Sequence, residues 1–197
     1  LAKRIDKAAG RLKQQERIVR KEGPQIGLVY DDTSLKPEEC HKEVAHKPGD
    51  EVTHRATIAG ALNYLNHRSR GAVMGTAADL FGSTSLSDLT LDKTHGYYNL
   101  EKSPVSRLIM IGGICEDAMG GFMSGLSAYG NHLGVSASYG AFIAALQHVP
   151  ARMHAIGQEA RAHIFGDKRT PFIIICGHAG PKPGEDGPPP ASPQALQ

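Results

Sequence analysis

Short apolar blocks alternate along the chain with stretches of helical character, and this alternation constrains the fold more than any other feature. Each block is followed by a loop rich in Gly, Ser or Asp. The blocks expected to form strands are residues 71–76, 107–112 and 171–176. Helices are expected at residues 53–66, 116–129 and 140–147. The alternation predicts the α/β class, with a mainly parallel sheet flanked by helices and with ligand-binding loops at the carboxyl ends of the strands.

The helix expected at residues 116–129 contains three glycines, Gly120, Gly121 and Gly125. Each glycine costs a helix up to about 1 kcal/mol relative to alanine. Close packing against another backbone would compensate for this cost, because a glycine lets two backbones approach. We therefore expect this helix to pack against a second subunit.

Size and composition narrow the possible partners. The 197 residues suffice for one domain with a hydrophobic core. A net charge of +2 is too small to indicate nucleic acid or an anionic membrane as the main partner. No apolar run approaches the roughly 18–20 residues that span a bilayer.

The cysteines show neither CxxC nor metal-ligand spacing; they are Cys40, Cys115 and Cys176. We therefore expect no metal ligands in this chain and a reducing, cytoplasmic location.

The first 52 residues differ in character from the rest. Residues 1–22 are rich in Lys and Arg and carry apolar residues at helical spacing, which predicts a basic amphipathic linker helix with a solvated face. Residues 23–52 are rich in Pro, Gly and charged residues and are expected to form a loop-rich connector. Residues 53–197 are expected to form the domain itself, truncated at its C-terminal end.

Two segments of this expected domain are specific enough to indicate a family. Gly113–Gly120 reads GICEDAMG, and Gly177–Pro188 reads GHAGPKPGEDGP. They resemble the GIREHAMG and HDSIGVGEDGP segments of transketolases. Three weaker matches lie in the same order, namely Thr76–Leu80 to GGSADL, Ser83–Thr90 to SNLT and Ser138–Phe142 to YGGTF. The colinear set covers about residues 50–197 and resembles the pyrimidine-binding, or middle, domain of the transketolase family.

The resemblance implies thiamine diphosphate as the cofactor. In the family, a glutamate carboxyl bonds to atom N1′ of the aminopyrimidine, and the cofactor's own 4′-amino group then takes the C2 proton. Glu116 matches that glutamate and is the expected catalytic residue. Phe142 matches an aromatic residue that packs on the pyrimidine ring, and Asp79 matches an aspartate near the thiazolium. By spacing alone, Glu116 and Asp79 could instead cap helices, and Phe142 could be an ordinary core residue.

Four further residues match substrate-binding positions of the family. His178, Arg55 and Ser83 correspond to positions directed towards the sugar phosphate, and Asp186 corresponds to a position near a donor hydroxyl. Arginine suits a phosphate because its guanidinium binds oxygens as a rigid fork. The alternatives are a surface helix charge for Arg55 and a turn residue for Ser83.

The sequence departs from the family pattern in three ways. Pro189-Pro190 stands where the family has Thr-His, so a donor-binding histidine is missing. Ala145 and His148 stand where the family has two further aromatic residues. No GDG segment occurs in the chain, so the Mg²⁺ that bridges the diphosphate needs ligands from a diphosphate-binding partner domain or subunit.

The implied function is the pyrimidine-binding half of a transferase that moves a two-carbon ketol unit between sugar phosphates, in a homo- or hetero-oligomer that supplies the other half. Dihydroxyacetone synthase and 1-deoxyxylulose-5-phosphate synthase are alternatives within the same chemistry. A third alternative is a non-catalytic subunit that uses the transketolase dimer surface for assembly. Retention of Glu116 favours an enzyme, whereas the loss of the loop histidine favours the assembly role.

Overall fold

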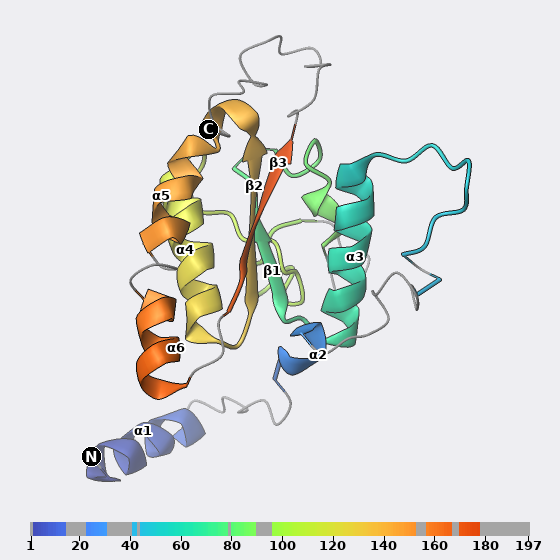
Figure 1. The fold of residues 1–197 in the computed structure, drawn as a ribbon. Helices are drawn as coiled ribbons and strands as arrows, with labels where there is room; N and C mark the ends of the chain where they lie inside the picture. The colour runs from blue at the N-terminus through green and yellow to red at the C-terminus, as the bar shows by residue number, and fades with distance from the viewer. Residues whose placement is uncertain are drawn as a thin grey trace.

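The computed structural model has a parallel sheet between two layers of helices (Figure 1). It describes residues 2–14, 23–30, 41–42, 44–78, 80–89, 96–152, 157–166 and 170–177. The helices are α1 (Ala2–Gln14), α2 (Gly27–Tyr30), α3 (His54–Arg68), α4 (Glu116–Tyr129), α5 (Ala144–Arg152) and α6 (Glu159–Phe165). The strands are β1 (Val73–Thr76), β2 (Leu133–Tyr139) and β3 (Phe172–Gly177), and the 3-10 helices are η2 (Leu86–Asp88) and η3 (Gly140–Phe142).

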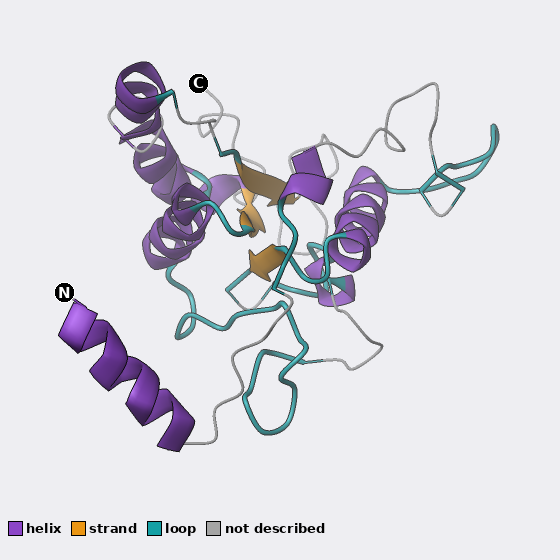
Figure 2. Ribbon diagram, turned by 90° about the horizontal axis from the view of Figure 1, so that it is seen from below, coloured by secondary structure: helices purple, strands orange, loops and turns teal. Residues whose placement is uncertain are grey.

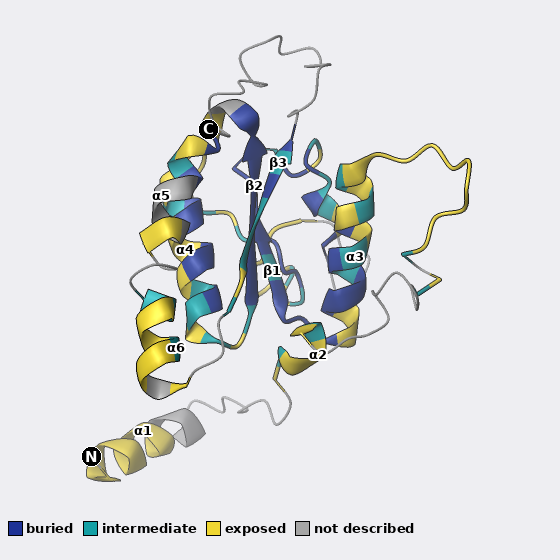
Figure 3. Ribbon diagram, viewed as in Figure 1, coloured by how far each residue is buried: buried dark blue, intermediate teal, exposed yellow. Residues whose placement is uncertain are grey.

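The sheet has the order β1-β2-β3, and both pairs of neighbouring strands are parallel. Val73 aligns with Leu133, and Gly134 aligns with Phe172. Strand β2 is therefore central, and all of its residues are buried (Figure 3). The expected α/β fold, with a mainly parallel sheet flanked by helices, is confirmed.

One expected strand is wrong. Residues 107–112 form no strand with the expected neighbours, but they run beside β1 and join it at an isolated bridge between Gly75 and Leu108. There the Gly75 amide donates to the Arg107 carbonyl at 2.9 Å, and the Ile109 amide donates to the Gly75 carbonyl at 2.8 Å. The strand between β1 and β3 is β2, whose Gly and Ser residues lack the apolar run typical of a buried parallel strand.

Helices cover both faces of the sheet. Helix α3 lies on one face, and α4 packs on the other in a layer with α5 and α6, as the two perpendicular views show (Figures 1 and 2). The expected basic helix is present as α1, which lies apart from the sheet with residues 2–10 exposed. Within the described residues, no helix is long and apolar enough to cross a membrane.

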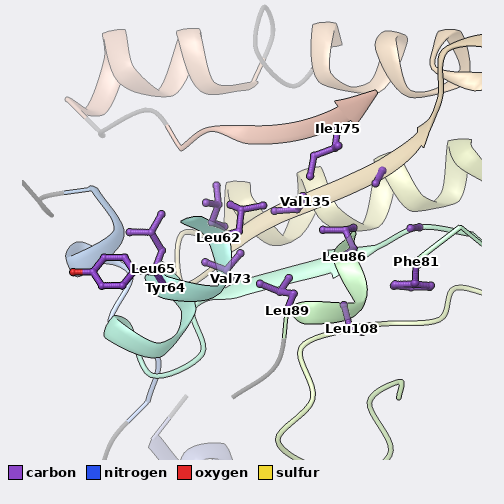
Figure 4. Close-up of a cluster of buried hydrophobic side chains, with 13 residues drawn as sticks. Leu62, Tyr64, Leu65, Val73, Phe81, Leu86, Leu89, Leu108, Val135 and Ile175 are labelled. Carbon is purple, nitrogen blue, oxygen red and sulfur yellow. The ribbon is translucent and has the colours of Figure 1, made fainter. Parts of the chain in front are cut away.

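Two apolar clusters hold these layers together. The larger one joins α3 to all three strands and includes Leu62, Val73, Val135 and Ile175 (Figure 4). The smaller one lies under α4 and α5 and consists of Ala78, Met119, Ile143 and Leu146. Part of the connector also packs on the larger cluster, through the partly buried side chains of Ile26, Val29 and Val44.

Helix α4 lies unusually close to β2 because the strand presents small residues to it. At Gly134, an added Cβ atom would overlap the backbone carbonyl of Met123. The Gly134 amide donates to the Ser127 Oγ at 2.7 Å, and the Ser136 hydroxyl donates to the Met119 carbonyl at 3.3 Å. Hydrogen bonds between a backbone group and a serine hydroxyl therefore join β2 to α4 at two places along the helix.

The three glycines of α4 have different surroundings. A Cβ atom at Gly120 would lie 3.2 Å from Leu146 Cδ2 of α5, so this glycine permits a close contact within the chain and not the expected contact with a second subunit. Gly121 and Gly125 are exposed, and a Cβ atom at either would meet no described atom within 4 Å. For these two glycines, the expected contact with a second subunit stays a prediction.

Gly71, Arg107 and His132 come together near the amino ends of β1 and β2. Gly71 has a φ of +90°, and an added Cβ atom there would overlap the guanidinium of Arg107, which is buried. Burial lowers the pKa of His132, and the positive charge of Arg107 lowers it further. The neutral imidazole is therefore the form that the fold favours at this position.

We predict that Gly134→Ala lowers the free energy of unfolding by about 1–3 kcal/mol, because the new methyl group meets the backbone of α4 and cannot be relieved by a rotamer change. Gly121→Ala is the matched control, since it adds a methyl group to open space on a helix and should stabilise the chain by about 0.5–1 kcal/mol. Urea denaturation measures both changes. Equal effects of the two substitutions would contradict the close packing of α4 on β2.

We also predict that the chain loses stability as the pH falls below about 6.5, the ordinary pKa of histidine. Because the folded state holds the pKa of His132 below that value, the unfolded state binds more protons in this range and is favoured by acid. Replacing His132 with Gln should flatten the decrease in unfolding free energy between pH 7.5 and pH 5.5. His67→Gln, at an exposed position on α3, is the control, and an equal change in that variant would count against the prediction.

Candidate functional site

Glu116 is the first residue of α4, and its side chain points to the central strand. Only 8% of the residue is exposed, although the preceding Cys115 is exposed. The Ser138 hydroxyl donates a hydrogen bond to Glu116 Oε1 at 2.9 Å, and Ser138 is itself fully buried. A carboxylate that only caps a helix accepts hydrogen bonds from backbone amides of its own first turn. The bond from Ser138 of β2 therefore argues against a purely capping role for Glu116.

The loop before Glu116 needs two glycines. Gly112 and Gly113 have φ values of +84° and +101°, which side chains other than glycine rarely adopt. Ile114 follows with 70% exposure, and then the chain turns inward at Glu116. The two glycines therefore allow the sharp turn that takes the chain from residues beside β1 to the start of α4.

The loop after β1 is tied to the same helix. The Ala78 amide donates to the Met119 sulfur at 3.2 Å, and both residues belong to the smaller apolar cluster. Asp79, the expected thiazolium-side residue, comes next in the chain but lies outside the described residues. Its neighbour Ala78 is thus fixed against α4, one turn from Glu116.

Phe142 ends η3, four residues beyond Ser138, and it is 46% exposed. The core positions of this segment are taken instead by Ile143 and Leu146, so Phe142 is not the ordinary core residue of the alternative interpretation. Ala145, at a position where the family has an aromatic residue, is partly buried. An accessible aromatic face therefore lies on the segment that follows the Glu116–Ser138 pair.

The structure brings Arg55 and Ser83 together. Arg55 Nη1, from the first turn of α3, donates to the Ser83 carbonyl oxygen at 2.5 Å. The Ser83 hydroxyl donates to the Leu80 carbonyl at 3.3 Å. Arg55 is partly buried, unlike a plain surface charge, and its guanidinium lies against the loop after β1.

These residues share one edge of the sheet, because parallel strands end on the same side. Ser83 follows β1, and Phe142 follows β2. Glu116 and Arg55 reach this edge through their hydrogen bonds to Ser138 and Ser83. His178 and Asp186 follow β3 in the sequence and lie outside the described residues. Loops at the carboxyl ends of parallel strands are the usual ligand site of α/β folds.

The residues at this edge fit one end of a heteroaromatic ligand. A buried carboxyl can bond a ring nitrogen, and a half-exposed Phe can pack on a ring face. Among the described residues, no group of three or more His, Cys, Asp or Glu side chains is placed to hold a metal ion. The sequence analysis assigned no role to Ser138, although this residue begins the Ser138–Phe142 segment that resembles YGGTF.

Comparison with known proteins agrees with this fold. The family described as "Transketolase, pyrimidine binding domain" matches residues 50–196. Among solved structures, the transketolase from Campylobacter jejuni subsp. jejuni NCTC 11168 superposes with a TM-score of 0.60 at 22% identity, over 97% of this chain and 26% of that one. The transketolase from Leishmania mexicana gives a TM-score of 0.52 at 22% identity, over 94% of this chain and 26% of that one. A comparison with curated protein sequences finds no match.

The chain thus spans about a quarter of the length of these solved transketolases. The similarity in fold extends over nearly the whole chain. The family match covers the helix that starts at Glu116, the central strand and most of the sequence after β3. On these grounds the chain belongs to the transketolase family, as a pyrimidine-binding domain.

Proposed function

We propose that this chain is the pyrimidine-binding half of a thiamine-diphosphate-dependent transferase that moves a two-carbon ketol unit between sugar phosphates. The observation that carries the proposal is the buried Glu116 carboxyl at the carboxyl edge of the sheet, bonded to Ser138 and followed by a half-exposed Phe142. When bound, the cofactor supplies the carbon nucleophile of the transfer. Glu116 would bond ring atom N1′ and hold or release a proton there, and Phe142 would pack on the ring. We assign Asp79 to the thiazolium side on the family resemblance alone.

The substrate side of the proposal rests on charge and position. Arg55 carries a guanidinium to the loop after β1, where Ser83 accepts its hydrogen bond. A guanidinium held in this way offers further N–H groups to phosphate oxygens. We assign Arg55, Ser83 and His178 to the sugar phosphate and Asp186 to a donor hydroxyl. The sugars of the pentose phosphate interconversions are the substrate class that this set would take.

The rest of the active site is proposed to come from a partner. The sequence has no GDG segment, so the ligands of Mg²⁺ and most contacts to the diphosphate are assigned to a diphosphate-binding domain or subunit. The outward face of α4 suits a contact with a second subunit, because Gly121 and Gly125 lie beside the exposed Phe122 and Tyr129. We propose that the assembled enzyme is a dimer or a larger oligomer and that it is located in the cytoplasm.

We predict that Glu116→Gln or Glu116→Ala lowers two-carbon transfer by about 10²–10⁴-fold in the protein assembled with its diphosphate-binding half, because one positioned acid–base group is lost. The fold should be retained, as measured by circular dichroism and urea unfolding. Asp117→Asn, at the next and exposed carboxylate of the same helix, is the matched control and should keep its activity. Near wild-type turnover in Glu116→Ala would contradict the proposed role.

We further predict that cofactor binding depends on the partner. The chain alone should bind thiamine diphosphate weakly in the presence of Mg²⁺, because it lacks the groups for the charged end of the cofactor. Addition of the diphosphate-binding half should give tight binding and turnover together, since a ligand that bridges two chains stabilises their assembly. Isothermal titration measures both states.

Two other outcomes of this titration are informative. Micromolar or tighter Mg²⁺-dependent binding by the chain alone would mean that the diphosphate site lies within it. Tight binding in the assembly with no transfer to any sugar phosphate would favour the non-catalytic assembly role, which the Pro189-Pro190 loop keeps open.

A further inference from the structure

The face of β2 that meets α4 carries three small residues, and each makes a different kind of contact with the helix. Gly134 bonds the C-terminal part of α4 through Ser127 Oγ, and Ser136 bonds the first turn of α4 through the Met119 carbonyl. Ser138 bonds the carboxyl of Glu116. The first two contacts fix the helix itself, whereas the third fixes a charged side chain.

The position of Ser138 is rigid. The residue is fully buried in the central strand, and it is aligned with Cys176 of β3. Its hydroxyl therefore cannot turn to water, and a buried hydroxyl without a partner is costly. Within the described residues, the Ser138 hydroxyl donates to Glu116 Oε1. This bond restricts the rotation of both side chains.

A hydroxyl donor on one oxygen of a carboxyl restricts the rotation of that carboxyl group. The second carboxyl oxygen is then held in one direction and is left for a ligand. An apolar residue at position 138 would not restrict the rotation in this way.

We propose that Ser138 is the positioning residue of Glu116, which holds Oε1 so that the other carboxyl oxygen faces ring atom N1′ of the cofactor. This inference rests on the proposed function of Glu116. It adds that the orientation of the Glu116 carboxyl is set by the central strand of the sheet and not by α4 alone. Ser138 acts through Glu116 and is itself no catalytic residue.

The test compares Ser138→Ala with Ser136→Ala in the protein assembled with its diphosphate-binding half. Both variants remove a fully buried hydroxyl from the same strand and face, but only Ser138 touches Glu116. The readouts are the Kd for thiamine diphosphate with Mg²⁺, the rate of deuterium exchange at C2 of the bound cofactor, and urea unfolding. Ser138→Ala should slow the exchange about tenfold, the worth of a hydrogen bond to a charged group.

Ser136→Ala should leave the exchange rate unchanged, although it removes a comparable buried hydrogen bond and should lower stability to a similar degree. The two variants therefore separate a structural role from a positioning role. Equal exchange rates in the two variants would overturn the proposal, whether both are slow or both are normal.

A double-mutant cycle with Glu116→Gln shows whether Ser138 works through the glutamate. If it does, Ser138→Ala should cause little further loss of exchange in the Glu116→Gln background, whereas additive losses would overturn the proposal. The cycle also separates the two claims. No effect of Glu116→Gln on exchange would reject the proposed function and this inference with it, while a large effect of Glu116→Gln with none of Ser138→Ala would reject only the inference.

Discussion

The close packing of α4 on the central strand is the constraint on which the rest of the structure depends. Its cause is a missing side chain, because the backbone of Met123 occupies the space that a Cβ atom of Gly134 would need. A helix this close to a strand leaves room only for small residues between them, and β2 has Ser136 and Ser138 at the next two facing positions. The polar groups of these residues are bonded across the contact, beside the buried side chains of Met119 and Met123.

This packing determines where the functional groups lie. Because α4 is fixed along its length on β2, its first residue is carried to the carboxyl end of the strand, and Glu116 becomes buried there. Met119, one turn further along, bonds the Ala78 amide and holds the loop after β1. One helix thus connects the loops of two strands at a single edge, and Gly112 and Gly113 let the chain reach it.

A different group of residues lies at the opposite edge of the sheet. There Gly71 leaves space for the buried Arg107 guanidinium, and the neighbouring His132 is favoured in its neutral form. None of these groups belongs to the matched motifs of the family. The molecule therefore keeps a buried guanidinium and a partly buried neutral imidazole at the amino ends of the strands and a carboxyl at their other ends, with the apolar clusters between them.

Local sequence patterns were enough to predict β1, β3 and the bounds of α4, because apolar blocks and a 3.6-residue period are read directly from neighbouring residues. The motif resemblance assigned Arg55 and Ser83 to the same ligand group, and in the structure the two residues are joined by a hydrogen bond. By itself the sequence determined the fold class and the family. Only the tertiary structure decided that residues 133–139 are the central strand and that Ser138 is the partner of Glu116. Small residues such as Gly134 and Ser138 carry no apolar signal of burial. They are buried because β2 lies between β1 and β3 and because α4, the preceding helix, packs on one face of it.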